Sequence, residues 1–196
     1  LLLAALMVLA FFGWKWWQAH LDKKAASAAG AYQTIVTMFD AGRDDEGFAL
    51  IESLRADYPK SPQVAAADLI AANVHVSNNE LDRARERLQR VADTARDKNL
   101  RPIAKLRLAR VQAAQAQYDA ALATLGTQDM GVHEAARLEI RGDILAAQGD
   151  PEGALKEYQA ARERLPAAEL QQGRVGELLD LKIADLGGKP ATEVAP

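Results

Sequence analysis

Apolar residues recur at helical spacing along most of this chain, with charged residues between them, a pattern typical of amphipathic α-helices. Asp150-Pro151 indicates a helix start, because aspartate can cap the first amides and proline tolerates the first helical position. Tyr58-Pro59 and Ser61-Pro62 close one helix and open the next in the same way. We therefore predict an all-α protein with helices at 44–57, 62–77, 80–97, 101–115, 118–126, 132–148, 151–164 and 167–186.

The predicted helices form a repeat. Three segments align with one another and a fainter copy lies at 44–62; the three are NELDRARERL at 79–88, AQYDAALATL at 116–125 and GDPEGALKEY at 149–158. A small residue opens the second helix of each unit, at Gly47, Ala84, Ala121 and Ala154, so the units follow one another after 37, 37 and 33 residues. A period of about 34 residues with two helices per unit is the signature of a tetratricopeptide array.

Small residues in the last unit indicate close packing between helices. Gly142, Ala154 and Ala161 match the small positions of a tetratricopeptide unit, Tyr158 matches its aromatic position and Pro166 its closing proline. Small side chains at these positions let two helix backbones approach, so that larger side chains can interdigitate. We therefore expect an α-solenoid of about four helical hairpins.

Domain boundaries follow from the same pattern. The repeat domain is expected at 44–186, and its last helix, which has no partner after it, is expected to cap the final hairpin. Residues 187–196 carry Gly and Pro without periodicity, as in a flexible tail. Residues 20–43 continue a long first helix that ends near residue 41. We expect this segment to pack against the first hairpin as a stiff stalk, through Tyr32, Ile35, Val36 and Phe39.

The N-terminal residues form an apolar run, LLLAALMVLAFFGWKWW, that ends in Trp14, Trp16 and Trp17. A membrane span needs about 20 apolar residues, and tryptophans settle at the membrane interface. We therefore expect residues 1–19 to be the exit half of a transmembrane anchor that is truncated at its N-terminus. The apolar part of a cleaved signal peptide is the alternative. Lys23 and Lys24 leave the orientation open, because the positive-inside rule compares both flanks of a span.

Composition argues against several kinds of function. The formal charge is −3 and the basic residues are scattered, which disfavours a nucleic-acid surface. The absence of cysteine excludes disulfides and thiolate metal sites, and it disfavours attachment as a lipoprotein. None of the histidines, His20, His75 and His133, has a carboxylate or second histidine at ligand spacing on its own helix face. We expect no catalytic residue, cofactor or metal, and a packing role for His75.

The first helices of successive tetratricopeptide units line a concave groove, which we expect to bind a partner. The positions that would line this groove are Leu69, Asn73 and Val76, then Ile103, Leu106 and Arg110, then Glu139 and Asp143. A mostly apolar lining suits an amphipathic helix or an extended apolar segment. The alternative is that Leu69 and Leu106 are ordinary packing residues and that Arg110 pairs with Asp143 across neighbouring units.

Longer motifs resemble one known family. The segments AGAYQTIVTMF, LRPIAKLRLARVQAAQAQYDAALATL and EAARLEIRGDILAAQGDPEGALKEYQAARERL, after a tryptophan-ended span, resemble the YfgM family of Gram-negative bacteria over about residues 1–186. The resemblance implies a single-span inner-membrane protein with its repeat domain in the periplasm. It also implies an ancillary subunit of the SecYEG translocon that pairs with a membrane-anchored, parvulin-like prolyl isomerase and assists unfolded, newly exported chains.

Two other functions fit the same repeat pattern. The chain could serve as a repeat scaffold of another cell-envelope assembly, with the same fold and a different partner. It could also be a regulator that sequesters a cytoplasmic response protein through an N-terminal arm that precedes the sequence. An enzyme would need a titratable cluster in a concave pocket, and the sequence offers none that can be assembled.

Overall fold

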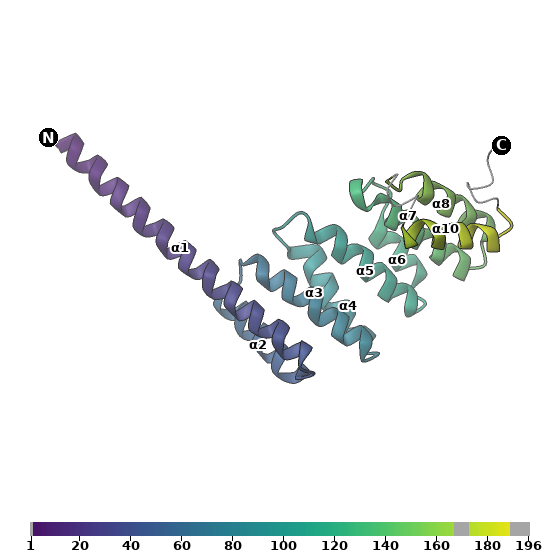
Figure 1. Cartoon of the computed structure of the whole chain (residues 1–196), viewed down its shortest axis with the longest axis horizontal. Helices are drawn as coiled ribbons and strands as arrows, with labels where there is room; N and C mark the ends of the chain where they lie inside the picture. Colours follow the sequence, from purple (N-terminus) through teal and green to yellow (C-terminus); the bar gives the residue numbers. More distant parts are fainter. Residues whose placement is uncertain (1, 167–172, 189–196) are drawn as a thin grey trace.

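The computed structural model describes the backbone of residues 2–166 and 173–188, and within them the side chains from residue 11 onward. In these ranges the chain forms nine α-helices and one short 3-10 helix, and no strand (Figure 1). The elements are α1 (Leu2–Asp40), α2 (Asp44–Asp57), α3 (Pro62–Ser77), α4 (Leu81–Thr94), α5 (Leu100–Ala114), α6 (Tyr118–Leu125), η1 (Gly131–His133), α7 (Glu134–Ala147), α8 (Pro151–Glu163) and α10 (Arg174–Asp185). The prediction of an all-α protein is confirmed.

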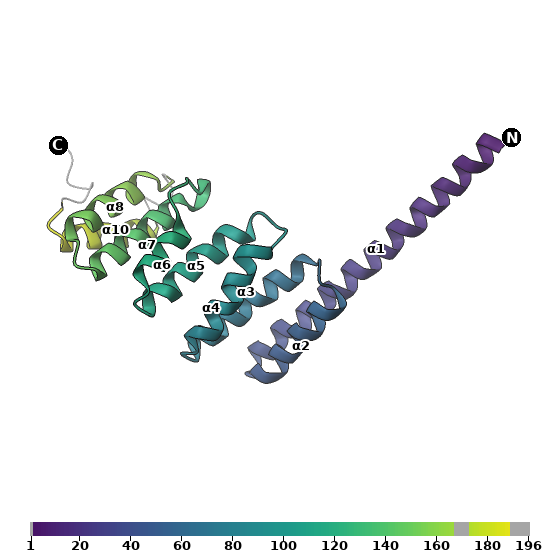
Figure 2. The ribbon, with the colours of Figure 1, turned by 180° about the vertical axis from the view of Figure 1, so that it is seen from behind.

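Successive helices pack antiparallel as a row of hairpins (Figures 1 and 2). The C-terminal part of α1 pairs with α2, and the next hairpins are α3 with α4, α5 with α6 and α7 with α8. Helix α10 packs against α8 and ends the row. The tetratricopeptide-like solenoid is therefore confirmed, and α1 supplies half of its first hairpin. The rest of α1 projects well beyond the array (Figure 1).

The small residues lie where helices touch, as the repeat predicts. Ala121 and Ala154 have no exposed surface, and Gly47 and Ala84 are buried as well. A Cβ atom on Gly142 would lie 2.5 Å from Cε1 of Tyr158, and one on Gly47 would lie 2.6 Å from Cε1 of Phe39. Such distances are far below van der Waals contact. Glycine at these two positions therefore makes room for an aromatic ring of the facing helix.

The apolar core is a row of clusters, and each joins one hairpin to the helix or hairpin beside it. One cluster joins α1, α2 and α3 around Ile35 and Ile51, and the next joins α3, α4 and α5 around Leu88 and Leu108. Two further clusters continue the row along α5 to α10. The expected packing of α1 through Ile35 and Phe39 is confirmed, since Ile35 is fully buried and Phe39 covers Gly47, but α1 packs as one half of the first hairpin and not as a separate stalk. In the part of the chain that the structure describes, every cluster therefore draws on three helices rather than on one hairpin alone.

The four hairpin turns share one backbone conformation. The residue two positions before the second helix of each hairpin has a positive φ: Gly42 at 69°, Asn79 at 58°, Ala116 at 57° and Gly149 at 82°. Their spacing equals that of the aligned small residues. Glycine adopts this left-handed region without strain, and an alanine there is sterically disfavoured.

Helix starts also follow the sequence signals. The Ser61 hydroxyl accepts a hydrogen bond from the Gln63 amide at 3.3 Å, and the Asp150 carboxylate accepts one from the Gly153 amide at 2.9 Å. Helix α4 ends at Thr94, before the predicted end at residue 97, because Ala95 leaves the helical conformation with a ψ of 128°. The predicted helix at 167–186 is confirmed from Arg174 on; residues 167–172 and the tail beyond 188 lie outside the described residues.

Candidate partner-binding surface

A hollow between α3 and α5 contains three of the predicted groove residues. Asn73, Val76 and Arg110 are exposed and help to line it, and its volume is about 270 Å³. The other lining residues are Ala72, Leu81, Leu88, Arg107, Val111 and Ala114. We call this surface the α3–α5 hollow. Its floor is apolar and two arginines stand at its rim, so it can receive an apolar segment that carries acidic groups.

The other apolar groove positions lie deeper than the sequence suggests. Leu69 is 7 % exposed and packs among α3, α4 and α5, and Leu106 is 5 % exposed and packs among α5, α6 and α7. Ile103 is half-buried against the same core as Leu69. Leu69 and Leu106 therefore have the surroundings of ordinary packing residues, as the alternative interpretation expects. A partner reaches Asn73, Val76 and Arg110 without displacing the core.

The acidic groove positions are engaged by the C-terminal helix. Lys182 of α10 lies 2.8 Å from the Glu139 carboxylate and 2.7 Å from the Asp143 carboxylate. Asp143 also accepts a hydrogen bond from the Tyr158 hydroxyl at 2.8 Å. The alternative pairing of Arg110 with Asp143 is wrong, because Arg110 lies nearest to Glu139, at 3.8 Å. Since α10 comes from the far end of the chain, the spacing within the repeats gave no sign of this contact.

The charges around Lys182 perturb two pKa values. Burial lowers the pKa of Lys182, but hydrogen bonds and charge from Asp143 and Glu139 outweigh it, so the net pKa is raised. Burial raises the pKa of the Tyr158 hydroxyl, and its bond to the Asp143 carboxylate raises it further. Lysine is therefore charged and tyrosine neutral at physiological pH, which keeps the α7–α8–α10 contact intact.

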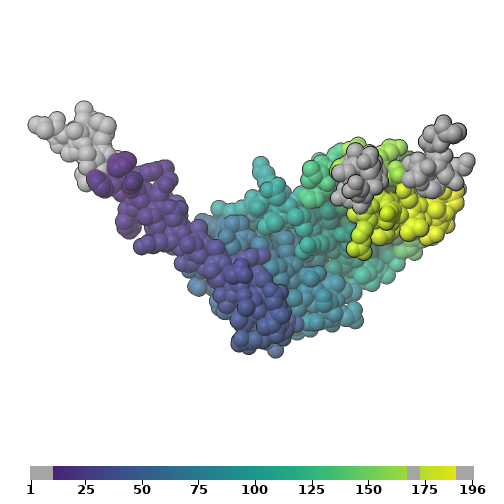
Figure 3. Space-filling view, viewed as in Figure 1, coloured from purple at the N-terminus to yellow at the C-terminus, as the bar shows by residue number. Residues whose placement is uncertain are grey.

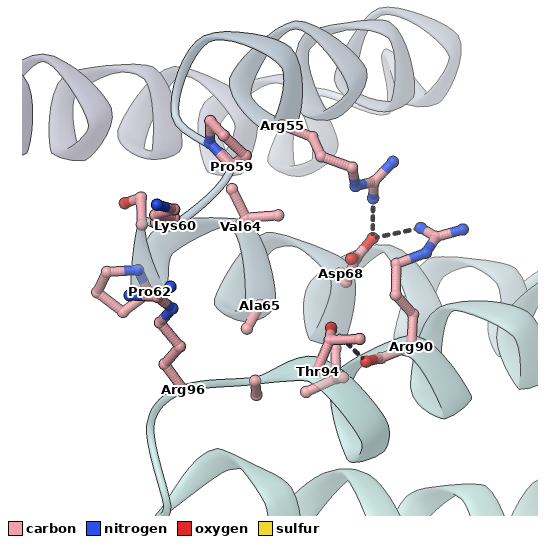
Figure 4. Close-up of a pocket in the computed structure, with 13 residues that line it drawn as sticks. Arg55, Pro59, Lys60, Pro62, Val64, Ala65, Asp68, Arg90, Thr94 and Arg96 are labelled. Atoms are coloured by element: carbon pink, nitrogen blue, oxygen red, sulfur yellow. Dashed lines mark hydrogen bonds and ion pairs between the residues drawn. The ribbon is translucent and has the colours of Figure 1, made fainter.

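A buried carboxylate joins the first two hairpins, and the sequence did not indicate it. Asp68 of α3 is 1 % exposed and accepts from Arg55 at 2.7 Å and from Arg87 at 2.9 Å, with Arg90 at 3.5 Å. Figure 4 shows Arg55 and Arg90 converging on Asp68 from neighbouring helices. Burial lowers the pKa of Arg55, but the charges and hydrogen bonds of Asp68 and Glu52 together outweigh it, so the net pKa is raised. Only the fold brings arginines from α2 and α4 to one aspartate.

His75 has a structural environment that includes a carboxylate from the next turn. It is 3 % exposed, its ring stacks on Phe48 with centroids 4.3 Å apart, and Nδ1 lies 2.6 Å from Glu80. The sequence reasoning missed Glu80, because it compared only residues on one helix face. The hydrogen bond with His75 holds the pKa of Glu80 below its usual range. Among the described residues, no group of three or more His, Asp or Glu is arranged to hold a metal ion.

The predicted membrane-interface residues stand on the projecting part of α1. Trp14, Trp16 and Trp17 are between 55 % and 69 % exposed. No helix in the described part of the chain is both long and apolar enough to cross a membrane. Residues 1–10 of the predicted anchor lie outside the described side chains. The transmembrane anchor is therefore not confirmed.

Known proteins match this chain over most of its length. A family model of the tetratricopeptide repeat-like domain matches residues 1–188. The chain is 39 % identical to the ancillary SecYEG translocon subunit of Escherichia coli K12 over 152 residues, which cover 77 % of this chain and 72 % of that protein. The chain belongs to the family of ancillary SecYEG translocon subunits.

Two further members support the assignment. The ancillary SecYEG translocon subunit of Neisseria gonorrhoeae is 31 % identical over 94 % of this chain and 88 % of its own length. That of Aggregatibacter actinomycetemcomitans is 32 % identical over 82 % of this chain and 78 % of its own length. The similarity to these translocon subunits therefore spans both the long first helix and the hairpin array, and it confirms the family that the sequence motifs indicated.

Proposed function

We propose that this protein is a non-enzymatic, membrane-anchored adaptor subunit of the SecYEG translocon. The observation that carries the proposal is the similarity to proteins named as ancillary subunits of this translocon, which extends over most of the chain. The fold supports an adaptor role, because a tetratricopeptide-like array presents an extended surface rather than an enclosed catalytic pocket. Residues 1–19 anchor the chain in the inner membrane, and the array lies in the periplasm.

The α3–α5 hollow is the proposed partner-binding surface. Asn73, Val76 and Arg110 offer one apolar and two polar contacts in a solvent-open position between neighbouring hairpins. The bound partner is a segment of the membrane-anchored prolyl isomerase, or a newly exported chain while it is unfolded. Apolar contact contributes about 25 cal/mol per Å² buried, and Arg107 and Arg110 favour acidic groups at the edge of that segment.

Copurification tests the translocon association. The full chain, extracted from membranes with a mild detergent, is expected to retain SecYEG subunits and the isomerase. Recovery of another envelope assembly, or of a cytoplasmic response protein, in place of SecYEG would support one of the alternative functions instead. Recovery of SecYEG without the isomerase would support the adaptor role but contradict the isomerase as the partner.

Site-specific crosslinking tests the hollow itself. Because the chain has no cysteine, Val76→Cys and Asn73→Cys each provide a single attachment point for a photocrosslinker. Glu86→Cys is the matched control, since Glu86 is exposed on α4 and borders a different surface. We expect crosslinks to the isomerase or to exported chains from the first two positions only. Equal yields from Glu86→Cys would reject the hollow as the binding surface.

A further inference from the structure

One edge of the array faces the same way as the N-terminal end of α1. Helices α3, α5 and α7 run parallel to α1, so the connections that precede them gather on the side from which α1 projects (Figures 1 and 2). These connections are residues 58–61, 95–99 and 126–133, and we call them the proximal edge. In Figure 3 the teal connection at 95–99 stands at the upper border of the array, on the side from which the purple α1 projects.

A basic hollow opens at the proximal edge, between the start of α5 and the connection from α6 to α7. Lys98, Arg101 and Lys105 line it, all three are exposed, and within the described residues none of them pairs with a carboxylate. The volume of the hollow is about 500 Å³. Its other lining residues are Ala92, Pro102, Ala123, Thr124, Leu125, Gly126, Thr127, Gln128, Asp129 and Met130.

Among the described residues that line this hollow, the positive charge exceeds the negative charge. Asp129 is the lining carboxylate, and it is engaged by Arg164 at 2.7 Å and by the Gly131 amide at 2.6 Å. Arg101 is held at the rim, because its Nε–H donates to the Ala95 carbonyl at 2.6 Å. Lys98 and Arg101 lie at the N-terminus of α5, where cations oppose the helix dipole and so do not stabilise the helix. An anion bound in the hollow would offset both the mutual repulsion and the unfavourable dipole.

The edge also carries an exposed apolar residue. Val132 is 95 % exposed and belongs to the same connection as the lining residues Met130 and Thr127. A valine without packing contacts contributes nothing to the core, and exposed apolar side chains beside cations suit the boundary between lipid headgroups and acyl chains. The combination points to a bilayer surface rather than to a soluble anion.

We propose that the basic hollow binds the phosphate groups of anionic phospholipids, with Val132 in contact with the bilayer surface. This inference rests on the membrane anchorage included in the proposed function. Leu21 and Ala25 of α1 share a second hollow with residues 57–63, so the proximal edge begins about 6–12 Å along the helix axis from Trp17. With the tryptophans at the interface, residues 57–63 at the start of this edge lie about one Debye length, roughly 10 Å, from the headgroups.

Fluorescence quenching in nanodiscs tests the proposal with the full chain. Because the chain has no other cysteine, Val132→Cys provides a single thiol for a fluorophore. The measurement is the quenching of this fluorophore by a quencher attached to lipid headgroups. Nanodiscs contain phosphatidylcholine alone or an equal mixture with phosphatidylglycerol. We expect strong quenching in the mixture, weak quenching in phosphatidylcholine, and loss of the difference as salt is raised, because exposed charges are screened.

Charge reversal identifies the residues. In the Val132→Cys background, Lys98→Glu with Lys105→Glu is expected to raise the phosphatidylglycerol content needed for half-maximal quenching by about fivefold or more. Lys156→Glu on the exposed surface of α8 is the control and should leave it unchanged. Circular dichroism checks that the variants are folded. The salt dependence of quenching in the Val132→Cys chain tests the headgroup site without any charge-reversed variant.

The outcomes separate this inference from the membrane anchorage. Equal quenching in both lipid compositions, or quenching that does not change with salt and charge reversal, would contradict the headgroup site. Neither result would contradict the membrane anchorage. Displacement of the label from the mixed bilayer by inorganic phosphate would assign the hollow to soluble anions and also overturn it. Release of the chain from phosphatidylcholine nanodiscs by an alkaline wash would overturn the anchorage itself.

Discussion

At the scale of single residues, this fold depends on where a side chain is missing. Gly142 and Gly47 face aromatic rings of the neighbouring helix, and fully buried alanines occupy the other close contacts. An added methyl group at such a position would clash with the facing helix. Protein interiors are close-packed, so neither helix backbone can shift to make room for it.

Gly142→Ala tests this packing directly. Its Cβ would lie 2.5 Å from the Tyr158 ring, so we expect the free energy of unfolding to fall by about 1–3 kcal/mol, measured by urea denaturation. Gly30→Ala makes the same chemical change in α1, with nothing within 4 Å, and should raise the stability by about 0.5–1 kcal/mol. Equal effects of the two substitutions would show that the ring contact does not constrain position 142.

A second residue-scale prediction concerns the hairpin turns. Ala116 has a φ of 57°, where the equivalent turns have glycine or asparagine. Ala116→Gly should therefore stabilise the protein by about 1 kcal/mol, because it removes the steric conflict of a Cβ in the left-handed region. Gly149→Ala places alanine at the equivalent turn and should destabilise by a similar amount. Thermal denaturation of both variants checks the opposite signs.

At the scale of elements, α10 is both a cap and a contact to the preceding hairpin. Leu179 and Ile183 pack with Ala154 and Tyr158 in one apolar cluster, while Lys182 reaches the two α7 carboxylates. Arg162 of α8 also pairs with Asp180 of α10. Apolar contact thus holds the helix in place, and the ion pairs fix its register along the hairpin.

Lys182→Met should loosen α10 without unfolding it. Loss of two charge-assisted hydrogen bonds in a partly exposed site is expected to cost about 1–2 kcal/mol, and Lys156→Met on the exposed face of α8 should cost less. Hydrogen exchange of the α10 amides measures the local effect. Exchange that rises equally throughout the chain would indicate global unfolding rather than release of α10.

The same contact should depend on pH in the alkaline range. Because the folded pKa of Lys182 is raised above its unfolded value of about 10.4, its contribution is complete below that value and is lost as pH rises through the folded pKa. The stability difference between the unmodified chain and Lys182→Met should therefore shrink above about pH 10.4. A difference that stays constant there would exclude lysine ionisation as its source.

At the scale of the whole molecule, each hairpin is stabilised by its neighbours. The core clusters link one hairpin to the next, so stability is approximately a sum over adjacent units. Helix α1 is the exception, because its C-terminal part belongs to the first hairpin while the remainder projects (Figure 1). A continuous helix of 39 residues, about 58 Å long, therefore fixes the array relative to the N-terminal end.

Proline substitutions separate the two parts of α1. Thr34→Pro falls next to the fully buried Ile35 and should lower the free energy of unfolding by about 3 kcal/mol or more, because it removes a helix hydrogen bond and clashes with the preceding turn. Ala19→Pro lies in the exposed projecting part and should leave the urea midpoint of the array unchanged. Similar midpoints for both variants would contradict the assignment of α1 to the first hairpin.

The sequence by itself determined the helices, their boundaries to within a few residues, and the pairing of helices into hairpins. These properties are local or periodic: helical spacing of apolar residues, proline and aspartate at helix starts, and small residues repeated at Gly47, Ala84, Ala121 and Ala154. It also indicated the family, because family motifs are runs of consecutive residues. Of the groove positions, Asn73, Val76 and Arg110 do lie together at an open surface.

Only the tertiary structure decided which polar groups meet. Lys182 joins Glu139 and Asp143 from about 40 residues away, and Asp68 collects arginines from two other helices. It also placed Leu69 and Leu106 in the core, because the depth of a helix face depends on how closely neighbouring hairpins stack. The physical reason is that hydrophobic periodicity specifies a face, whereas the distance between two charged groups depends on the packing of every element between them.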